Sequence, residues 1–350
     1  MNKKRVLLTG AAGFAGSHIL RHLLSNTDYD IVCVCGWEHM GTPERIHEAM
    51  VDRNYELSSL AKPYEGVPYF QRVEVITHDL SKPIPEMTKK RIGKCDYIIN
   101  LAAESHVDRS ITEPRQFIEN NVGTALNMLE FAREYPPEMF IQFSTDEVYG
   151  VAPQGVNHKE WSPIVPSNPY SASKACQEAI AISYWRTYGV PVIITNTMNL
   201  FGETQAPEKY MAKIIRMVKE GESVPVHGKD GVFGSRYYLH ARNMADAILF
   251  IMKFVKPDLY QEDITLLPER FNIVGDLELD NKQVAHKIAG VLGKSLVWHE
   301  EDYHTGRPGH DRRYALDGQK LYDRGWRAPR TFDESLKTYI EWTLKHDKWL

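Results

Sequence analysis

Cysteine is scarce in this sequence, basic residues do not outnumber acidic ones, and there is no long hydrophobic run. Its cysteines have a spacing that fits neither a disulfide framework nor a metal site: Cys33, Cys35, Cys95 and Cys176. We therefore expect reduced thiols in apolar surroundings and no bound metal. The formal net charge of -4 offers no basic field for nucleic acid. No apolar run approaches the roughly 18 to 20 residues that cross a bilayer, so we expect no membrane partner.

What the chain does contain is the composition of a globular protein. Hydrophobic residues make up 43% of it and charged residues 25%, and its 350 residues can bury a large core. The N-terminus enters an apolar segment at Val6, which leaves no room for a signal peptide, so we expect a cytoplasmic protein. The length also predicts two domains.

A glycine-rich turn follows the first predicted strand, residues 6–9, and leads into an apolar helix. Gly10 and Gly13 let the backbone turn sharply and approach a pyrophosphate, while Gly16 lets the helix pack closely on the strand. The free N–H groups of the helix N-terminus, near Phe14 and Ala15, stabilise that anion. A glycine triplet alone also fits a plain tight turn, but the strand before it and the helix after it favour dinucleotide binding.

The ends of the next strands predict the rest of a cofactor site. Strand 31–34 ends at Cys35, where an acidic residue that binds the ribose of NAD is expected, and Glu38 is the nearest candidate. No arginine stands there to favour NADP, so we predict NAD. Strand 73–77 and strand 97–101 lead to further candidate cofactor residues: Asp79, Leu80, Leu101, Ala102 and Ala103. Residues 39–70 form a long charged connection with helical stretches near residues 44–50, whose role the sequence does not reveal.

Two later stretches carry the candidate chemistry. The apolar run 139–143 predicts a buried strand that delivers Thr145, Asp146 and Glu147 at its carboxyl end, where ligands of open α/β sheets bind. Downstream, a good N-cap, Asn168, precedes proline at the first helical position.

That helix start places Tyr170 and Lys174 in the first turns, four residues apart and therefore on one face. A neighbouring cation favours the phenolate form of tyrosine, so the pair can take a proton from an alcohol while a hydride leaves its carbon. An ordinary surface pair has the same spacing. The glycine turn favours the catalytic interpretation.

Strands and helices alternate from residue 5 to about residue 198, which predicts a doubly wound parallel Rossmann sheet of the α/β class with a smaller C-terminal α/β domain. We expect an NAD-binding domain at 1–198, to which part of 231–251 returns, and a substrate domain at 199–350.

The glycine turn and the stretches 101–110, 144–150 and 170–174 together resemble the extended short-chain dehydrogenase/reductase superfamily. The similarity is greatest to its dTDP-glucose 4,6-dehydratases and runs nearly end to end, including Asn199, 205–209, Arg236, 271–275 and 307–314. The most specific feature is Thr145-Asp146-Glu147, because related epimerases lack both carboxylates. Decarboxylases have serine before the glutamate, and inverting or CDP-sugar dehydratases have lysine after the aspartate.

The resemblance implies a lyase mechanism with no net redox change. Tyr170, supported by Lys174 and Thr145, takes the proton of the glucose 4-hydroxyl as hydride passes from C4 to NAD. Glu147 removes the C5 proton, and Asp146 protonates the 6-hydroxyl so that water leaves. The hydride then returns to C6. For the two carboxylates, a solvated turn or a helix cap is the alternative.

The resemblance also implies which residues hold a sugar nucleotide: Ser105, Thr145, Asn199, Lys209, Arg236, Asn272, Arg307 and His310. Cations suit a diphosphate, although each residue alone could be a surface charge or a satisfied polar group. The chain departs from the family pattern at 201–203, 237–238, His240, Asn243 and Gly306, which leaves the base and the sugar open.

Helices near 114–133 and 168–186 have apolar faces, formed by Phe117, Val122, Leu126 and Leu129 on one and by Ile180, Ile182 and Tyr184 on the other. The resemblance implies a homodimer across a four-helix bundle, and packing on the protein's own sheet is the alternative. For the function, the alternatives are the same reaction on UDP-glucose or another sugar nucleotide, a UDP-glucuronate decarboxylase, and an NAD-binding regulatory protein.

Overall fold

The computed structural model describes residues 3–37, 40–51, 68–262, 266–302 and 311–350. Its centre is a parallel sheet with the strand order β12-β6-β5-β4-β1-β2-β3. The strands span Arg5–Thr9 (β1), Asp30–Cys35 (β2), Val73–Thr77 (β3), Tyr97–Asn100 (β4), Met139–Thr145 (β5), Val192–Thr197 (β6) and Glu269–Ile273 (β12). The predicted doubly wound sheet is therefore confirmed, with each predicted strand within two residues of its observed ends.

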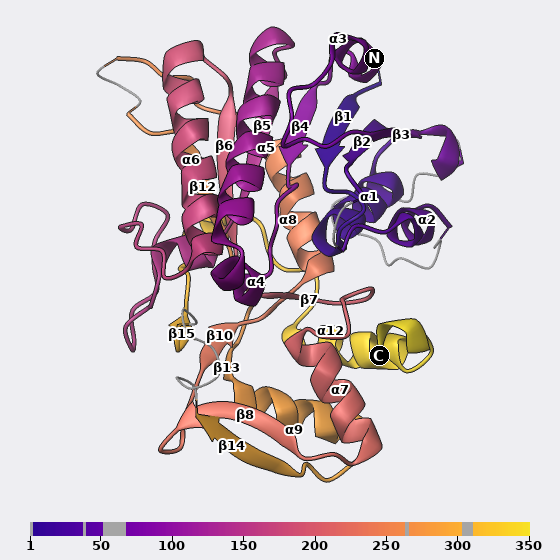
Figure 1. The fold of residues 1–350 in the computed structure, drawn as a ribbon, viewed down its shortest axis with the longest axis vertical. Coiled ribbons are helices and arrows are strands. Elements are labelled where there is room, and N and C mark those ends of the chain that lie inside the picture. Colours follow the sequence, from indigo (N-terminus) through magenta and orange to yellow (C-terminus); the bar gives the residue numbers. More distant parts are fainter. Residues whose placement is uncertain (1–2, 38–39, 52–67, 263–265, 303–310) are drawn as a thin grey trace.

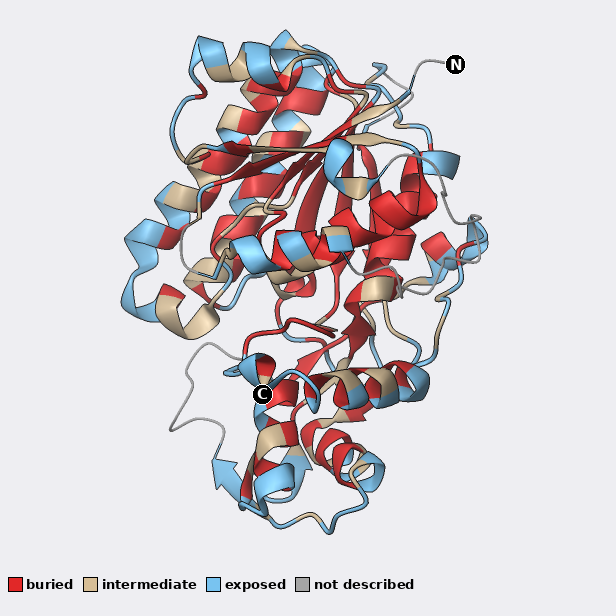
Figure 2. Ribbon diagram, turned by 90° about the vertical axis from the view of Figure 1, so that its right-hand side faces the viewer, coloured by how far each residue is buried: buried red, intermediate tan, exposed pale blue. Residues whose placement is uncertain are grey.

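Helices cover both faces of this sheet, and each interface has its own hydrophobic core (Figures 1 and 2). On one face α1 (Phe14–Asn26) packs against α8 (Ala241–Phe254) and α2 (Pro43–Val51). On the other lie α3 (Glu86–Ile92), α5 (Pro114–Glu134) and α6 (Pro169–Tyr188), of which the last two pack closely together. The chain thus returns to the sheet after residue 199 through both α8 and β12.

Of the apolar side chains predicted on α5 and α6, some are buried in the core and others lie at the surface. Phe117 and Leu129 are buried, and Ile180 and Ile182 pack at the edge of the core. Leu126 has an exposed fraction of 41%. These helices therefore pack on the sheet and still present apolar side chains to solvent.

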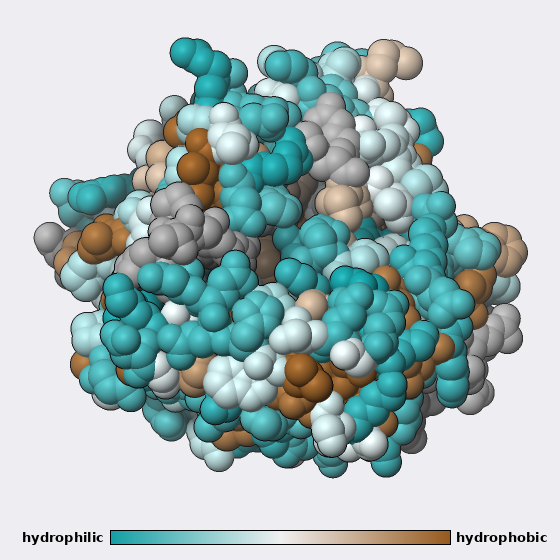
Figure 3. All heavy atoms as spheres, turned by 60° about the horizontal axis from the view of Figure 1, so that its bottom comes forward, coloured by the Kyte–Doolittle hydropathy of each residue, from teal (hydrophilic) through white to brown (hydrophobic). Residues whose placement is uncertain are grey.

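The smaller C-terminal part has a third core between helices and short strands. Its helices are α7 (Tyr210–Glu220), α9 (Asn281–Val291) and α12 (Phe332–Thr343), whereas α11 (Gln319–Asp323) packs on β12 of the central sheet. Its strands are β7 (Leu200–Phe201), β8 (Val224–Lys229), β9 (Val232–Phe233), β10 (Ser235–Tyr237), β11 (Leu239–His240), β13 (Glu278–Asp280), β14 (Trp298–Asp302) and β15 (Arg313–Tyr314). On the face in Figure 3 hydrophilic residues predominate, and hydrophobic ones form separate patches.

Short elements complete the chain: α4 (Val107–Thr112) and the 3-10 helices η1 (Tyr69–Gln71), η2 (Asp146–Tyr149) and η3 (Asp347–Trp349). Among the described residues, no helix is both long and apolar enough to cross a bilayer, and no cluster of His, Cys, Asp and Glu could hold a metal ion. Three cysteines are buried, Cys176 is exposed, and all four are free thiols.

Candidate active site

The glycine turn between β1 and α1 forms a cradle that side chains would fill. Gly10 has a φ of 71°, a left-handed conformation that favours glycine. A Cβ atom on Gly16 would lie 2.1 Å from the carbonyl oxygen of Gly10, which only glycine permits. Gly13 is the N-cap of α1 and has no side chain to cap the helix. The N–H groups of the first turn, from Phe14 and Ala15, are thus directed at a site that fits the pyrophosphate of NAD.

The wall opposite this turn is held by Thr9, a residue that the sequence analysis did not identify as functional. Its hydroxyl oxygen accepts hydrogen bonds from the backbone N–H groups of Leu101, at 2.9 Å, and Ala102, at 3.0 Å. The same hydroxyl donates to the Asn100 side chain at 3.1 Å. The segment that begins at Leu101 and includes Ala103 therefore lies against the glycine turn.

The other predicted cofactor residues lie at the ends of β2 and β3. Cys35 is buried, and burial raises the pKa of its thiol to about 11, while a hydrogen bond from the backbone of Ala12 in the glycine turn opposes the rise. The carboxylate of Asp79 accepts a hydrogen bond from the Ser81 backbone at 2.9 Å, and Leu80 is buried beside it. Glu38 lies outside the described residues.

The reacting end of the site is the tip of β5. The strand continues through Thr145, and η2 then carries Asp146 and Glu147. The hydroxyl of Thr145 donates to Asp146 at 2.8 Å and accepts a hydrogen bond from the backbone N–H of Glu147 at 3.3 Å. The Asn168 amide donates to the carboxylate of Glu147 at 3.2 Å while its oxygen caps α6 through the backbone of Ser171. Sequence analysis identified only that capping role of Asn168.

Burial changes the acidity of both carboxyl groups. It raises the pKa of Asp146 to about 6, and the Thr145 hydrogen bond opposes the rise. It raises the pKa of Glu147 to about 7, helped by the charge of Asp146. Arg236, on β10, opposes both shifts, which places this cation near the two acids. One oxygen of Asp146 is buried without a hydrogen-bond partner. Two adjacent carboxyl groups that titrate near neutral pH suit proton transfer.

Tyr170 and Lys174 lie in the first turns of α6, which begins at Pro169 behind the predicted Asn168 cap. One part of the prediction needs correction. We expected the ammonium to lower the pKa of Tyr170, but burial and the negative charges of Glu147 and Asp146 raise it instead. The Lys174 Nζ atom donates to the carbonyl oxygen of Phe143 at 2.7 Å and to the Gln177 side chain at 2.5 Å. Burial lowers the pKa of this lysine to about 8.

The predicted substrate residues divide into those near the reacting end and those elsewhere. Asn199 has a buried side-chain oxygen without a hydrogen-bond partner. Burial lowers the pKa of His106, and the charge of Lys209, the N-cap of α7, lowers it further, which places this lysine near the histidine. Ser105 is exposed beside that histidine. Asn272 instead lies inside the sheet, where its amide donates to the carbonyl oxygens of His158 and Asp317, each at 3.0 Å.

Arg307 and His310 lie outside the described residues. The structure adds two neighbours of Glu147 that were not singled out as site residues, Asp311 and Tyr314, whose charges and pKa values are coupled to it. Both residues belong to the stretch 307–314 that resembles the family, so this stretch was the signal in the sequence that could have identified them.

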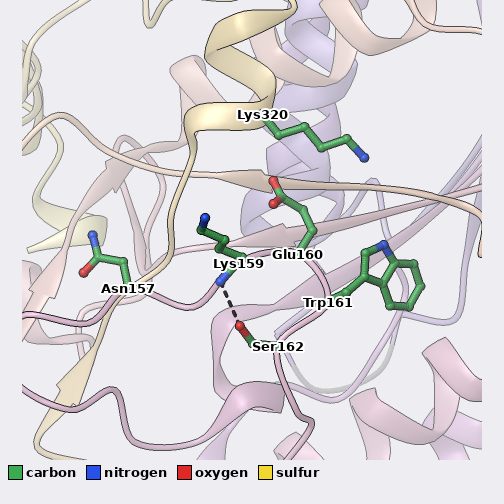
Figure 4. A pocket seen from close by; sticks show the side chains of 6 residues that line it. All are labelled: Asn157, Lys159, Glu160, Trp161, Ser162 and Lys320. Atoms are coloured by element: carbon green, nitrogen blue, oxygen red, sulfur yellow. Dashed lines mark hydrogen bonds between the residues drawn. The ribbon is translucent and has the colours of Figure 1, made fainter.

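The structure also has a surface hollow of about 590 Å³ (Figure 4). It is lined by Asn157, Lys159, Glu160, Trp161, Ser162 and Lys320. The backbone N–H of Lys159 donates to Ser162, and Glu160 accepts a hydrogen bond from the backbone of Asn272 at 3.3 Å. The hollow includes none of the candidate catalytic residues.

Known proteins match the chain along its whole length. The model of the NAD dependent epimerase/dehydratase family matches residues 6–273. "dTDP-glucose 4,6-dehydratase 1" of Escherichia coli K12 is 32% identical over 99% of this chain and 94% of its own length. The low-salt glycan biosynthesis protein Agl12 of Haloferax volcanii is 33% identical over 98% of this chain and 99% of its own.

Solved structures agree in fold. The dTDP-glucose 4,6-dehydratase DesIV from Streptomyces venezuelae, with NAD and TYD bound, has a TM-score of 0.81 and 28% identity, and covers 99% of this chain and 98% of its own. A UDP-glucose 4-epimerase from Thermus thermophilus, in complex with NAD, has a TM-score of 0.79 at 23% identity, a likeness that concerns the fold alone. With its parallel sheet, glycine cradle and Tyr170–Lys174 pair, this chain belongs to the NAD dependent epimerase/dehydratase family.

Proposed function

We propose that this protein is an NAD-dependent sugar-nucleotide 4,6-dehydratase that converts dTDP-glucose to dTDP-4-keto-6-deoxyglucose and water. The observation that carries the proposal is the pair Asp146 and Glu147 at the tip of β5, next to Tyr170, with pKa values raised to about 6 and about 7. A dehydration needs an acid and a base at one reacting end, whereas epimerisation at C4 needs neither carboxylate.

In the proposed reaction, Tyr170, Glu147 and Asp146 each transfer a different proton. NAD held at the glycine turn of Gly10, Gly13 and Gly16 would supply a reversible hydride acceptor for C4 and C6 of the sugar. Tyr170 takes the proton of the 4-hydroxyl, and its raised pKa makes the phenolate a strong base once it forms. Glu147 takes the C5 proton, which the C4 ketone acidifies, and Asp146 gives a proton to the departing 6-hydroxyl. Glu147 then returns its proton to C5, and the proton that Tyr170 took from the 4-hydroxyl balances the one that Asp146 gave up, so the net loss is one water.

We infer that the sugar nucleotide lies between the sheet and the C-terminal part, residues 199–350 apart from the segments that return to the sheet. Arg236 and Lys209 supply positive charge for the diphosphate, and the buried side-chain oxygen of Asn199, which has no hydrogen-bond partner, can accept a hydrogen bond. The same chemistry would suit a UDP-sugar, so the test must compare bases.

The test follows deuterium from C4 of the sugar. A panel of dTDP-, UDP-, CDP- and GDP-glucose labelled at C4 is given to the purified protein, and the product is examined by NMR. We expect dTDP-glucose to give a 4-keto-6-deoxy sugar with deuterium in its new methyl group and solvent hydrogen at C5. Deuterium retained at C4, or stoichiometric NADH released into solution, would contradict a dehydratase.

We also propose a homodimer built across α5 and α6. Both helices carry apolar side chains on their outer surface, among them Ile118 and Leu126, each 41% exposed, and Tyr188, which is 50% exposed. Removing such surface from water stabilises association.

A further inference from the structure

A fully buried ion pair lies directly behind the reacting end of the site. Glu178 on α6 and Arg270 on β12 are 2.6 Å apart, and neither side chain is exposed to solvent. The desolvation of two charges often offsets the attraction between them, so an apolar pair of similar size would stabilise the fold about as well. The position of this pair therefore suggests a role in the reaction.

Arg270 is held from several sides. Its guanidinium donates to the Tyr149 hydroxyl at 3.2 Å and to the Glu160 carbonyl oxygen at 3.1 Å. It also stacks 4.2 Å from the ring centre of Trp161, one wall of the hollow in Figure 4. Contacts of this kind fix the guanidinium plane and, with it, the carboxylate that it binds.

The second oxygen of Glu178 reaches the reacting end through one side chain. It accepts a hydrogen bond at 2.8 Å from the amide of Asn196 on β6. The same amide nitrogen donates to the carbonyl oxygen of Thr145 at 3.0 Å. Because Thr145 is the last residue of β5, this connection sets the backbone from which Asp146 and Glu147 project.

Glu178 also lies one helical turn beyond Lys174, on the same face of α6. The ammonium of Lys174 donates only to neutral acceptors among the hydrogen bonds of the described residues, those on Phe143 and Gln177. Burial lowers the pKa of Lys174 to about 8, and the charge of Glu178 opposes that shift. Among the described residues, the ionisable groups around this site also include Tyr170 on α6, the two acids of η2, Arg270 on β12, and Glu160 and Tyr149 beside it.

We propose that Glu178 is a positioning residue for the reaction, which fixes Thr145 through Asn196 and keeps Lys174 in its charged form. A charged lysine is what allows Tyr170 to give up its proton, since nearby acids make the phenolate unfavourable. The proposal rests on the proposed function only for the identity of the substrate.

The first measurement follows the charge on Lys174 directly, without substrate. The protein is produced with lysine labelled with carbon-13 at the ε-carbon, and the Lys174 signal is assigned by its loss in Lys174→Arg. We expect the titration midpoint of this signal to fall by about one pH unit in Glu178→Gln, a tenfold increase in the acid dissociation constant. A matched control is Glu269→Gln. Glu269 lies next to Arg270 on β12, and its carboxylate pairs with Lys320 and Arg324. The midpoint in this variant should equal that of the wild type.

The second measurement separates position from charge. Glu178→Asp keeps the charge but withdraws it from Asn196, so kcat should fall several-fold while the Lys174 midpoint and the KM for the sugar nucleotide stay near their wild-type values. An unchanged midpoint in folded Glu178→Gln would overturn the proposal.

A variant that leaves Arg270 without its partner risks poor folding. Glu178→Gln combined with Arg270→Met removes both charges, and its Lys174 midpoint should still be lower than in the wild type. If neither variant folds, the pair is a structural element of the sheet and the proposal fails. A wild type that does not turn over dTDP-glucose would contradict the proposed function, while the NMR result would still decide the role of Glu178.

Discussion

Asp146 and Glu147 differ from surface acids because they are adjacent, poorly hydrated and close to one cation, Arg236. Desolvation disfavours the charged form of each, and ionisation of one makes ionisation of the other harder. Their titration is therefore coupled, and the titration midpoints belong to the pair rather than to either residue alone.

This coupling predicts a bell-shaped dependence of kcat on pH. Glu147 must be deprotonated to act as a base, so its active fraction grows as pH rises through about 7. Asp146 must be protonated to act as an acid, so its active fraction falls as pH rises through about 6. The rate of elimination should peak between those values. A kcat for product formation that does not change with pH over this range would contradict the assigned roles.

Substitution of the reacting groups should separate oxidation from elimination. Tyr170→Phe should abolish reduction of the bound cofactor by the sugar. Glu147→Gln and Asp146→Asn should lower overall turnover by roughly 10²- to 10⁴-fold, the usual contribution of general acids and bases, with a smaller effect on oxidation.

Single-turnover absorbance at the NADH band measures oxidation apart from product formation. The matched control is Glu119→Gln, an exposed carboxylate on α5 that should leave both steps unchanged. Full turnover by Glu147→Gln would show that another group takes the C5 proton.

At the scale of elements, the contact between β1 and α1 admits no side chain at Gly16, where a Cβ atom would lie 2.1 Å from the Gly10 oxygen and 2.7 Å from its carbon. Gly16→Ala must therefore push the helix away from the turn, and we expect a loss of at least tenfold in NAD affinity. Gly290→Ala on α9 is the control, since nothing lies within 4 Å of its Cβ position. It should keep NAD affinity and gain about 0.5 to 1 kcal/mol of stability. Calorimetric titration and thermal unfolding measure the two effects.

The sequence left the role of α2 open. In the structure this helix holds the segment 202–206, which precedes Lys209, through hydrogen bonds from Arg45. The Arg45 guanidinium donates twice to the Thr204 carbonyl oxygen, at 3.1 and 2.9 Å, and stacks on Trp349 near the C-terminus. A ring nitrogen of His18 on α1 lies 2.9 Å from the Glu203 carbonyl oxygen. The cofactor half of the molecule thus holds the segment that leads to a candidate substrate residue.

Arg45→Met should therefore raise the KM for the sugar nucleotide more than it lowers kcat, because it releases this segment without touching the reacting groups. Steady-state kinetics with NAD in excess measure the two constants. The exposed Arg115 on α5 offers a control substitution, Arg115→Met, with no expected effect. A fall in kcat alone would argue against this role for Arg45.

At the scale of the whole molecule, the exposed apolar side chains on the outer faces of α5 and α6 predict a homodimer. A charge at Leu126, which is 41% exposed, should disrupt a dimer because it would be buried without a partner. We expect Leu126→Glu to run as a 40.2 kDa monomer in light scattering and the wild type at twice that mass. Val232→Glu places the same charge on an apolar residue that is 63% exposed in the C-terminal part and should leave the dimer intact. A monomeric wild type would refute the assembly.

Local patterns in the sequence were sufficient to predict the sheet and the glycine turn, and they pointed to the residues that we propose to react. Each depends on neighbours in the chain: a strand is read from a short apolar run, the α6 cap from Asn168 and Pro169, and the glycine turn from its spacing. The strand predicted at 139–143 continues for two more residues in the structure, Ser144 and Thr145, so that Thr145 lies at the edge of the sheet.

Only the tertiary structure decided how these residues are charged and what supports them. The pKa of Tyr170 rises because α6 brings it against two acids of η2, and no spacing in the sequence encodes the balance of burial and charge. Glu178 and Arg270 are 92 positions apart, yet they meet where β12 joins β6. The sequence determined the strand, turn and helix start that carry the groups proposed to react. Packing between distant segments determined their acidity, because desolvation and Coulomb interactions depend on distances in space.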